Sequence, residues 1–170
     1  MNTDSTNAVL RNMIADYLNI GTSDAPVWEL MGTGFNTLDE NPQAQMDTKA
    51  YISDRAATSI IKGYKTQFPF DTDLIESEKA VMALYNIGRN QLQGGMAELE
   101  YCRVEVFLPA TPAVDGVHPA RKFRVAVEVS GITGAGAEVI HVAGNLNNVG
   151  DFVDGQFDIN ARAFDPAATP

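Results

Sequence analysis

The side chains that most often carry out chemistry are scarce in this chain of 170 residues. It holds two histidines, His118 and His141, and one cysteine, Cys102. Neither histidine has Cys, His or Glu neighbours at the spacing of a metal-ligand set, and one cysteine cannot form an intramolecular disulfide. No Gly-x-Ser-x-Gly motif supplies a nucleophile. The sequence therefore predicts no catalytic residue and no metal ligand.

A glycine-rich stretch and an aspartate-rich stretch each suggest a ligand site at first sight. Residues 131–136 read Gly-Ile-Thr-Gly-Ala-Gly, but a dinucleotide fingerprint requires a helix directly after the glycines, and here the pattern predicts a strand. Asp151, Asp154 and Asp158 resemble a calcium loop, yet an EF-hand needs oxygen ligands at alternate positions and a distal Glu. A hairpin turn and a solvated turn explain the two stretches better.

Two pairs of carboxylates, Glu98 with Glu100 and Asp71 with Asp73, are also present. A glycosidase needs two carboxylates facing each other across a cleft, and neither pair has a recognisable set of partners. We interpret them as solvated strand or cap residues. The expectation is a chain that is not an enzyme and that binds no cofactor.

The charge of the chain disfavours binding to nucleic acid. Its 22 acids exceed its 12 bases and give a net charge of −10, and residues 1–57 hold eight of the acids against three bases. Phosphate binding is carried by Lys and Arg, so an acidic chain is a poor nucleic-acid binder. No apolar run approaches the roughly 20 residues that cross a bilayer, and no signal peptide is recognisable, so we expect synthesis in a cytoplasm and no membrane partner.

The first third of the chain is predicted to contain a short helix, a strand and a long loop. Residues 7–19 place apolar side chains at helical spacing, and Gly21 could end that helix. This helix either packs on its own domain or forms an N-terminal arm, residues 1–22, that docks on a neighbouring subunit. Residues 27–35 resemble a strand, and residues 36–57 form a polar loop whose length suggests a contact with a partner.

The middle of the chain predicts a strand followed by the clearest helix. Residues 58–70 have β character, and residues 74–87 have helical spacing. Asp73 as N-cap and Glu76 at the third helical position make a capping-box pattern, with Gly88 placed to end the helix.

Four strands are predicted beyond the helix, at residues 99–108, 121–130, 138–145 and 153–159, and the second and third form a hairpin. A C-terminal tail, residues 159–170, follows. The order predicts one mainly β domain over residues 1–170. We expect an antiparallel β-sandwich or barrel with one flanking α-helix, a long inter-strand loop and terminal arms.

Several segments, in order along nearly the whole chain, together resemble the major tail-tube proteins of bacteriophages with long non-contractile tails. They are PVWELMGTG at 26–34, LDENPQAQ at 38–45, GYKTQFPFD at 63–71, DLIESEK at 73–79, ALYNIGRN at 83–90, ARKFRVAVEV at 120–129 and GNLNNVGD at 144–151. The resemblance lies in the sum of these segments, and it does not extend beyond Asp158.

The resemblance implies a β-sandwich subunit that forms hexameric rings, which stack into a hollow tube. Through that tube DNA passes without specific binding. It further implies a location in the virion, and as partners other copies of the chain, a tape-measure protein, and tail terminator and tip proteins. On this basis the candidate contacts between subunits are Val9, Met13, Tyr17, Leu38, Met46, Tyr51 and Ile52. The candidate lumen or surface acids are Asp39, Glu40, Asp47 and Asp54.

Two other functions stay open at this stage. The inner tube of a tail-like bacteriocin or another injection device would share the fold and differ in cargo. A β-sandwich binding module of a virion would need an exposed aromatic cluster, for which an aromatic share of 8% with one tryptophan, Trp28, offers little material.

Overall fold

The structure is a computed structural model that describes residues 7–167. In the first half of the chain the elements are β1 (Ile14–Asn19), β2 (Trp28–Leu30), β3 (Phe35–Leu38), β4 (Ala44–Lys49), β5 (Thr58–Tyr64), β6 (Gln67–Asp73) and α1 (Lys79–Arg89). The second half contains β7 (Glu98–Glu105), β8 (Val117–Thr133), β9 (His141–Asn148), β10 (Val153–Asp158) and β11 (Ala163–Pro166). Short 3₁₀ turns lie at Arg11–Met13 and Gly94–Ala97.

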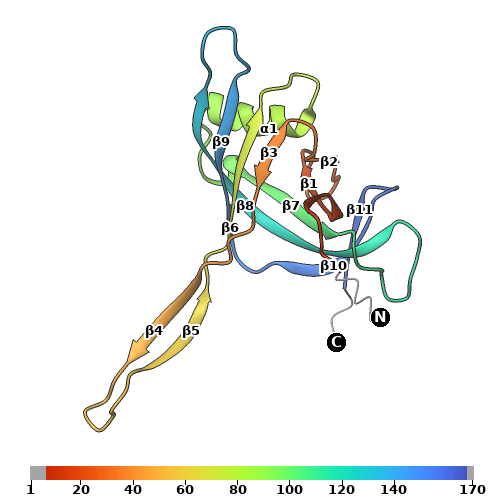
Figure 1. The fold of residues 1–170 in the computed structure, drawn as a ribbon. Helices are drawn as coiled ribbons and strands as arrows, with labels where there is room; N and C mark the ends of the chain where they lie inside the picture. The colour runs from red at the N-terminus through yellow and green to blue at the C-terminus, as the bar shows by residue number, and fades with distance from the viewer. Residues whose placement is uncertain (1–6, 168–170) are drawn as a thin grey trace, which may run out of the picture.

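Nine of the strands form one antiparallel sheet, and the remaining two form a separate hairpin (Figure 1). The large sheet has the order β2-β1-β7-β8-β9-β6-β3, with β10 paired to the first half of β8 and β11 paired to β10. This confirms the predicted mainly β, antiparallel fold with one helix. The sheet is not a closed barrel, because no ladder joins β1 to β3.

Apolar side chains occupy both faces of the large sheet. Successive residues of a strand point to opposite faces, and in β7 Tyr101 joins the larger core while Cys102 joins the smaller one. The larger core lies under α1 and is filled by Phe68, Tyr101, Phe123 and Leu146 among others. The smaller core lies under β10 and β11, where Phe157 stacks on Tyr17 at 4.4 Å between ring centroids.

The helix α1 is displaced from its predicted position by five residues at its start. Its N-cap is Glu78, without a side-chain cap, so the predicted capping box of Asp73 and Glu76 is wrong. Asp73 ends β6 because residues 67–73 alternate between buried and half-buried and pair with β9. Gly88 lies within the helix, where a Cβ would stand 2.7 Å from Val129 of β8, so glycine permits the close packing of helix on sheet.

The predicted helix at residues 7–19 is also wrong. Only Arg11–Met13 makes a helical turn, and Ile14–Asn19 forms β1 between β2 and β7. Tyr17 and Leu18 are both buried, but on opposite faces of the sheet, in the smaller and the larger core respectively. Because both faces of β1 are covered, its apolar residues are adjacent in sequence, and this spacing imitates a helical pattern.

The predicted long loop at residues 36–57 is wrong in form, since it contains most of β3, the strand β4 and the connecting loop of a β-hairpin. β4 pairs antiparallel with β5 over Ala44–Tyr64, with a bulge at Gln45/Met46, and only residues 50–57 form the connecting loop. The strand predicted at residues 58–70 is accordingly divided into β5 in the hairpin and β6 in the large sheet. The strand predicted at residues 27–35 is likewise divided, because the chain turns at Gly34, whose φ is +91°.

The remaining strand predictions agree with β7, β8, β9 and β10, and β8 and β9 form the predicted antiparallel hairpin. The C-terminal segment contains a strand that was not predicted, β11, in the region taken as a tail. The predicted N-terminal arm and C-terminal tail extend in part, at residues 1–6 and 168–170, outside the described residues.

Candidate assembly site

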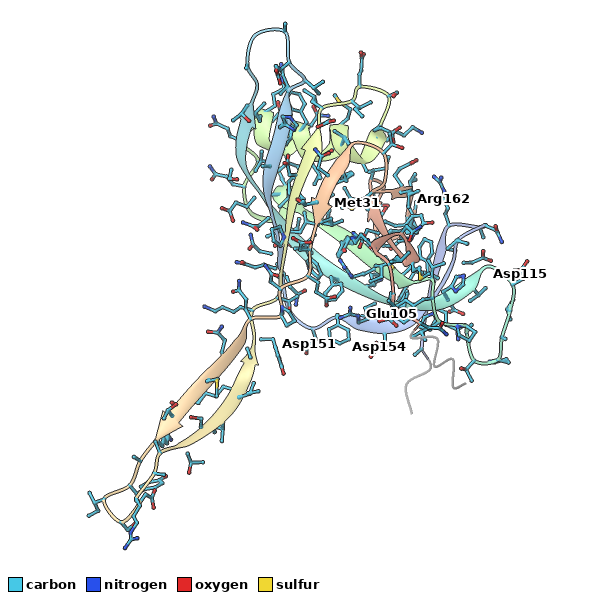
Figure 2. All side chains as sticks on the ribbon, viewed as in Figure 1. Met31, Glu105, Asp115, Asp151, Asp154 and Arg162 are labelled. Carbon is cyan, nitrogen blue, oxygen red and sulfur yellow. The ribbon has the colours of Figure 1, made fainter. Side chains whose placement is uncertain are left out.

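The β4–β5 hairpin projects from the body of the molecule with no other element beside it (Figures 1 and 2). Almost every residue of both strands is exposed on both faces. Its exposed large apolar side chains are Met46, Tyr51, Ile52, Ile60, Ile61 and Tyr64, and Ile52 at the tip is fully exposed. A two-stranded hairpin is marginally stable in water by itself, and exposed apolar clusters of this kind mark interaction surfaces.

Polar contacts within the hairpin define its conformation. Lys62 Nζ lies 2.8 Å from the Asp47 carboxylate, and the hydroxyls of Thr48 and Ser59 are 2.9 Å apart across the strands. At the tip, the backbone amide of Tyr51 donates to the Asp54 carboxylate, and the amide of Asp54 donates to the Tyr51 carbonyl. This turn holds Ile52 at the outermost point of the hairpin.

An ion-pair clamp fixes the base of the hairpin to the large sheet. Glu40 lies between β3 and β4, and its two carboxylate oxygens accept hydrogen bonds of 2.7 and 2.9 Å from Arg121 of β8. Arg103 Nε of β7 lies 3.3 Å from the same carboxylate. The hydrogen bond from Arg121 to Glu40 raises the pKa of that guanidinium. Bidentate pairs of this kind have directional specificity, so the clamp determines where the hairpin leaves the body.

The clamp continues into a buried polar network. Arg103 also contacts Asp16 of β1, to which the Tyr101 hydroxyl donates a hydrogen bond. Burial lowers the pKa of Arg103, but the adjacent Tyr101 and Asp16 outweigh that effect and the net shift is upward. Burial, with the neighbouring Asp16 charge, raises the pKa of the Tyr101 hydroxyl well above its ordinary value. Every charge in this network therefore has a partner, as burial requires.

A second surface is the uncovered half of the large sheet, on the face opposite α1. Val127 of β8 and its register partner Leu146 of β9 point toward the helix side, so the residues next to each of them along its strand point away from it. The outward set comprises Gln67, Pro69, Asp71 and Asp73 of β6; His141, Ala143, Asn145 and Asn147 of β9; Arg124, Ala126 and Glu128 of β8; and Glu98 and Glu100 of β7. We call this set the polar face.

Most side chains on the polar face are small, amide-bearing or acidic, and its basic members are Arg124 and His141, the latter 3.0 Å from the Asp73 carboxylate. Arg124 is paired with Glu98, and at the edge of this face Lys122 Nζ lies 3.6 Å from Glu100. Glu128 accepts a hydrogen bond from Asn147, and among the described residues no salt bridge joins it to a Lys or Arg. Such a surface offers a polyanion few positive charges to bind.

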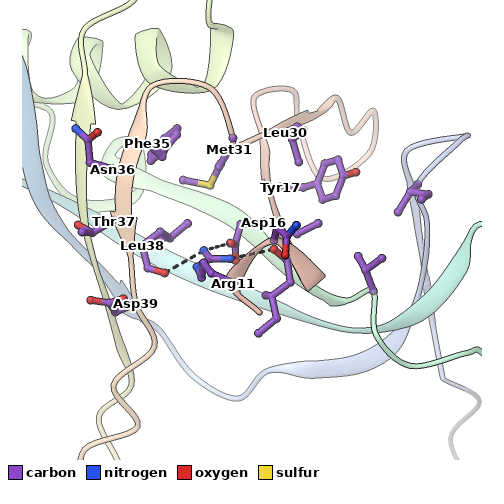
Figure 3. A pocket seen from close by; sticks show the side chains of 16 residues that line it. Arg11, Asp16, Tyr17, Leu30, Met31, Phe35, Asn36, Thr37, Leu38 and Asp39 are labelled. Carbon is purple, nitrogen blue, oxygen red and sulfur yellow. Dashed lines mark hydrogen bonds and ion pairs between the residues drawn. The ribbon is translucent and has the colours of Figure 1, made fainter. Parts of the chain in front are cut away.

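The third feature is a groove of about 640 Å³ at the open seam between β1 and β3 (Figure 3). Leu30, Met31, Phe35 and Leu38 line it with apolar groups, and Arg11 crosses it. Arg11 donates hydrogen bonds to the Leu38 carbonyl at 3.1 Å and to the Asp16 carboxylate at 2.5 Å. This side chain bridges the two strands where the sheet has no ladder.

The structure separates the predicted inter-subunit contacts into two groups. Tyr17 and Leu38 are 6% and 2% exposed in the chain's own cores, so we leave them out of the interface that we propose. Val9, Met13, Met46, Tyr51 and Ile52 are exposed, and the last three lie on the hairpin. Ile60, Ile61 and Tyr64 belong to the same hairpin and were missed, because their β pattern suggested a core strand.

The predicted lumen or surface acids all lie off the polar face. Glu40 belongs to the clamp, Asp47 pairs with Lys62, and Asp54 closes the turn at the hairpin tip. Asp39 is exposed at the rim of the groove. The acids of the polar face were missed as a group, although strand alternation combined with correct pairing would have placed them together.

The residues first considered for chemistry lie apart from one another. His141 is 3.0 Å from the Asp73 carboxylate, and Asp158 accepts hydrogen bonds from the amides of Asn160 and Ala161 in the β10–β11 turn. Asp154 lies in β10 and Asp151 precedes that strand (Figure 2). Over residues 7–167, no group of three or more His, Cys, Asp and Glu side chains is placed to hold a metal ion. No helix in that range is long and apolar enough to cross a membrane.

The fold and these surfaces define an antiparallel β protein with one helix and a projecting hairpin. No protein-family model matches the chain, and a search of curated proteins finds no relative. Among solved structures, a chain from the cryo-EM structure of the anti-feeding prophage baseplate, 6-fold symmetrised, superposes with a TM-score of 0.49. The two chains are 7% identical, and the match covers 88% of this chain and 96% of the other. At this identity and score the likeness identifies no function for this chain.

Proposed function

We propose that this chain is a structural subunit that assembles with copies of itself into rings, and that the rings stack into a hollow tail tube of a virion. The observation that carries the proposal is the bare β4–β5 hairpin, which is exposed on both faces and has six large apolar side chains. A soluble monomer rarely keeps such a surface uncovered. Packing against a neighbouring subunit would bury these apolar side chains and so account for their exposure in the single chain.

The polar face supports the hollow form of the assembly. A bore through which DNA slides must not bind phosphate, since each uncompensated Lys or Arg on the wall would retain it. On the polar face Arg124 is neutralised by Glu98, and amides and acids predominate. We propose that this face, and not the acids of the hairpin segment, lines the bore.

Ring closure and stacking require two different surfaces on each subunit. A heterologous interface between identical chains closes into a ring where the rotation permits, and otherwise continues as a filament. We assign the hairpin to contacts between rings because it projects furthest from the body (Figure 1). The Glu40 clamp supports this role, since a contact between rings needs a hairpin with a defined direction.

The test compares the intact chain with a variant in which residues 44–64 are replaced by a short glycine-serine link. This deletion removes both hairpin strands and leaves Glu40 and β6 in place. Sedimentation velocity over rising concentration should show large assemblies for the intact chain and only single subunits or single rings for the variant. Circular dichroism should show a folded β protein in both. A variant that still forms long polymers would refute the role of the hairpin.

A further inference from the structure

The groove between β1 and β3 is lined by apolar side chains that suit the docking of a protruding apolar residue, which we call a knob. The sheet stops short of closure here, because β2 pairs only with Tyr17–Asn19 of β1. On the edge of β1 away from β7, the Asp16 carbonyl accepts from the Met31 amide and the Ile14 carbonyl accepts from the Arg11 side chain, with no ladder to β3. Its wall includes Leu30, 43% exposed, and the half-buried Phe35. Figure 3 shows Leu30, Met31 and Phe35 among the side chains that line this wall.

The knob that fits this description is on the same chain, at the far end of the hairpin. Ile52 is fully exposed and Tyr51 is 68% exposed, and the turn between Tyr51 and Asp54 presents both. The hairpin points away from the body, so its own groove is out of reach (Figure 1). A knob and a groove on one chain that cannot meet within it form a heterologous pair between copies.

Charge favours the same partner. Residues 44–65 carry four cations, Lys49, Arg55, Lys62 and Lys65, against the two acids Asp47 and Asp54. The rest of the chain then holds twenty acids and eight bases. A positive hairpin is attracted to a negative body, and such complementarity directs association. At the contact itself, exposed Asp39 on the groove rim matches exposed Arg55 near the tip.

We propose that the groove between β1 and β3 is the docking site for the β4–β5 hairpin tip of a second copy of this chain, with Ile52 and Tyr51 seated against Leu30 and Phe35. The inference rests on the proposed tube function and names the partner surface that the hairpin requires. Each subunit then donates one hairpin and receives another, so the contact propagates along the stacking axis.

Disulfide trapping tests the contact between copies. Chains carrying Ile52→Cys are mixed with chains carrying Leu30→Cys, assembled, and oxidised. The native Cys102 is fully buried, and burial raises the pKa of its thiol, so it contributes little background. We expect a covalent dimer in the mixture. The matched control replaces Leu30→Cys by Val114→Cys, a site on the loop before β8 that is at least as exposed, at 57% against 43%, and should give no dimer above background.

A second probe covers the case in which loss of Ile52 itself prevents assembly. Ser53→Cys leaves the knob intact and places the thiol one residue away. Charge reversal supplies independent evidence: Asp39→Lys should raise the concentration needed for assembly by roughly tenfold, and Arg55→Glu in the same chain should restore it. Asp115→Lys, remote on the loop before β8, is the control and should leave assembly unchanged.

The outcomes distinguish this inference from the function on which it rests. If polymers form normally without a specific cross-link, or cross-link equally to Val114→Cys, the proposed docking site is wrong and the proposed tube function is not contradicted. A failure of Arg55→Glu to compensate Asp39→Lys also counts against it. If the wild-type chain stays monomeric at every concentration, both the tube and the docking site are wrong.

Discussion

Replacing Glu40 by glutamine should destabilise the protein far more than the exposure of this residue suggests. The glutamine keeps the size of the side chain and removes its charge. Arg121 then loses a bidentate partner at 2.7 and 2.9 Å, and Arg103, whose side chain is 8% exposed, keeps Asp16 at 3.3 Å. Two guanidinium groups lie near each other with one negative charge fewer between them.

The magnitude follows from the burial of the partners. Removing one member of a fully buried pair costs about 3–5 kcal/mol, while exposed pairs contribute about 0–1 kcal/mol. Glu40 and Arg121 are 20% and 26% exposed, so solvent screens part of the effect. We expect Glu40→Gln to lower the free energy of unfolding by about 2–3 kcal/mol, which raises the unfolded-to-folded ratio roughly 30- to 150-fold.

The assay is urea denaturation followed by tryptophan fluorescence, with Trp28 buried in the smaller core as the reporter. The matched control is Asp47→Asn, which breaks the single contact with Lys62, whose side chain is 60% exposed, and should cost less than about 1 kcal/mol. Hydrogen exchange should show faster exchange of the β4–β5 amides in Glu40→Gln. A change below about 0.5 kcal/mol in Glu40→Gln would refute the clamp.

Three further predictions follow from packing and charge. Gly88→Ala should lower the melting temperature, because its Cβ would stand 2.7 Å from Val129. The loss in free energy of unfolding is about 1–3 kcal/mol, and Val129→Ala in the same chain should recover part of it. Asp73→Ala removes no helix cap and loses only the part-exposed contacts of its carboxylate with Asn36 and His141, so it should lower the free energy of unfolding by less than about 1 kcal/mol. A loss of about 2 kcal/mol, the upper end for an N-cap, would contradict that placement. The double change Asp71→Lys and Glu128→Lys should leave assembly intact and slow the passage of DNA. DNA that binds to the variant tubes at low salt and is released at high salt would support the polar face as the bore, and unchanged passage would count against it.

The second half of the fold was readable from the sequence because its strands carry strict alternation. Residues 121–130 place Phe123, Val125 and Val127 on one face, and β8 has this arrangement. The resulting mainly β antiparallel class was correct. The prediction failed for β1, where cores on both faces of the sheet remove the alternation that identifies a strand.

The helix start failed for a related reason. Asp73 and Glu76 satisfy the local rule for a capping box, but the pairing of β6 with β9 keeps residues 67–73 extended. Pairing between segments some 70 residues apart is not visible in local spacing, and here it overrides the local preference.

The hairpin that we propose as an interface overlaps the segment that the sequence indicates, but it differs from that segment in form. The length and polarity of residues 36–57 indicated a contact segment, yet its partner strand β5 was taken as part of the core because Ile60 and Ile61 are apolar. The Glu40 clamp joins residues 81 apart in sequence, so no pattern within a single segment could reveal it.

The central claim is that the chain assembles into a hollow tube in which the hairpin connects successive rings. Cryo-electron micrographs of the concentrated wild-type protein test it most directly. The account predicts tubes of uniform width with an open bore, β4–β5 crossing between rings, and the polar face with Asp71 and Glu128 toward the bore. Dispersed monomers at every concentration, or filaments with a solid centre, would contradict it.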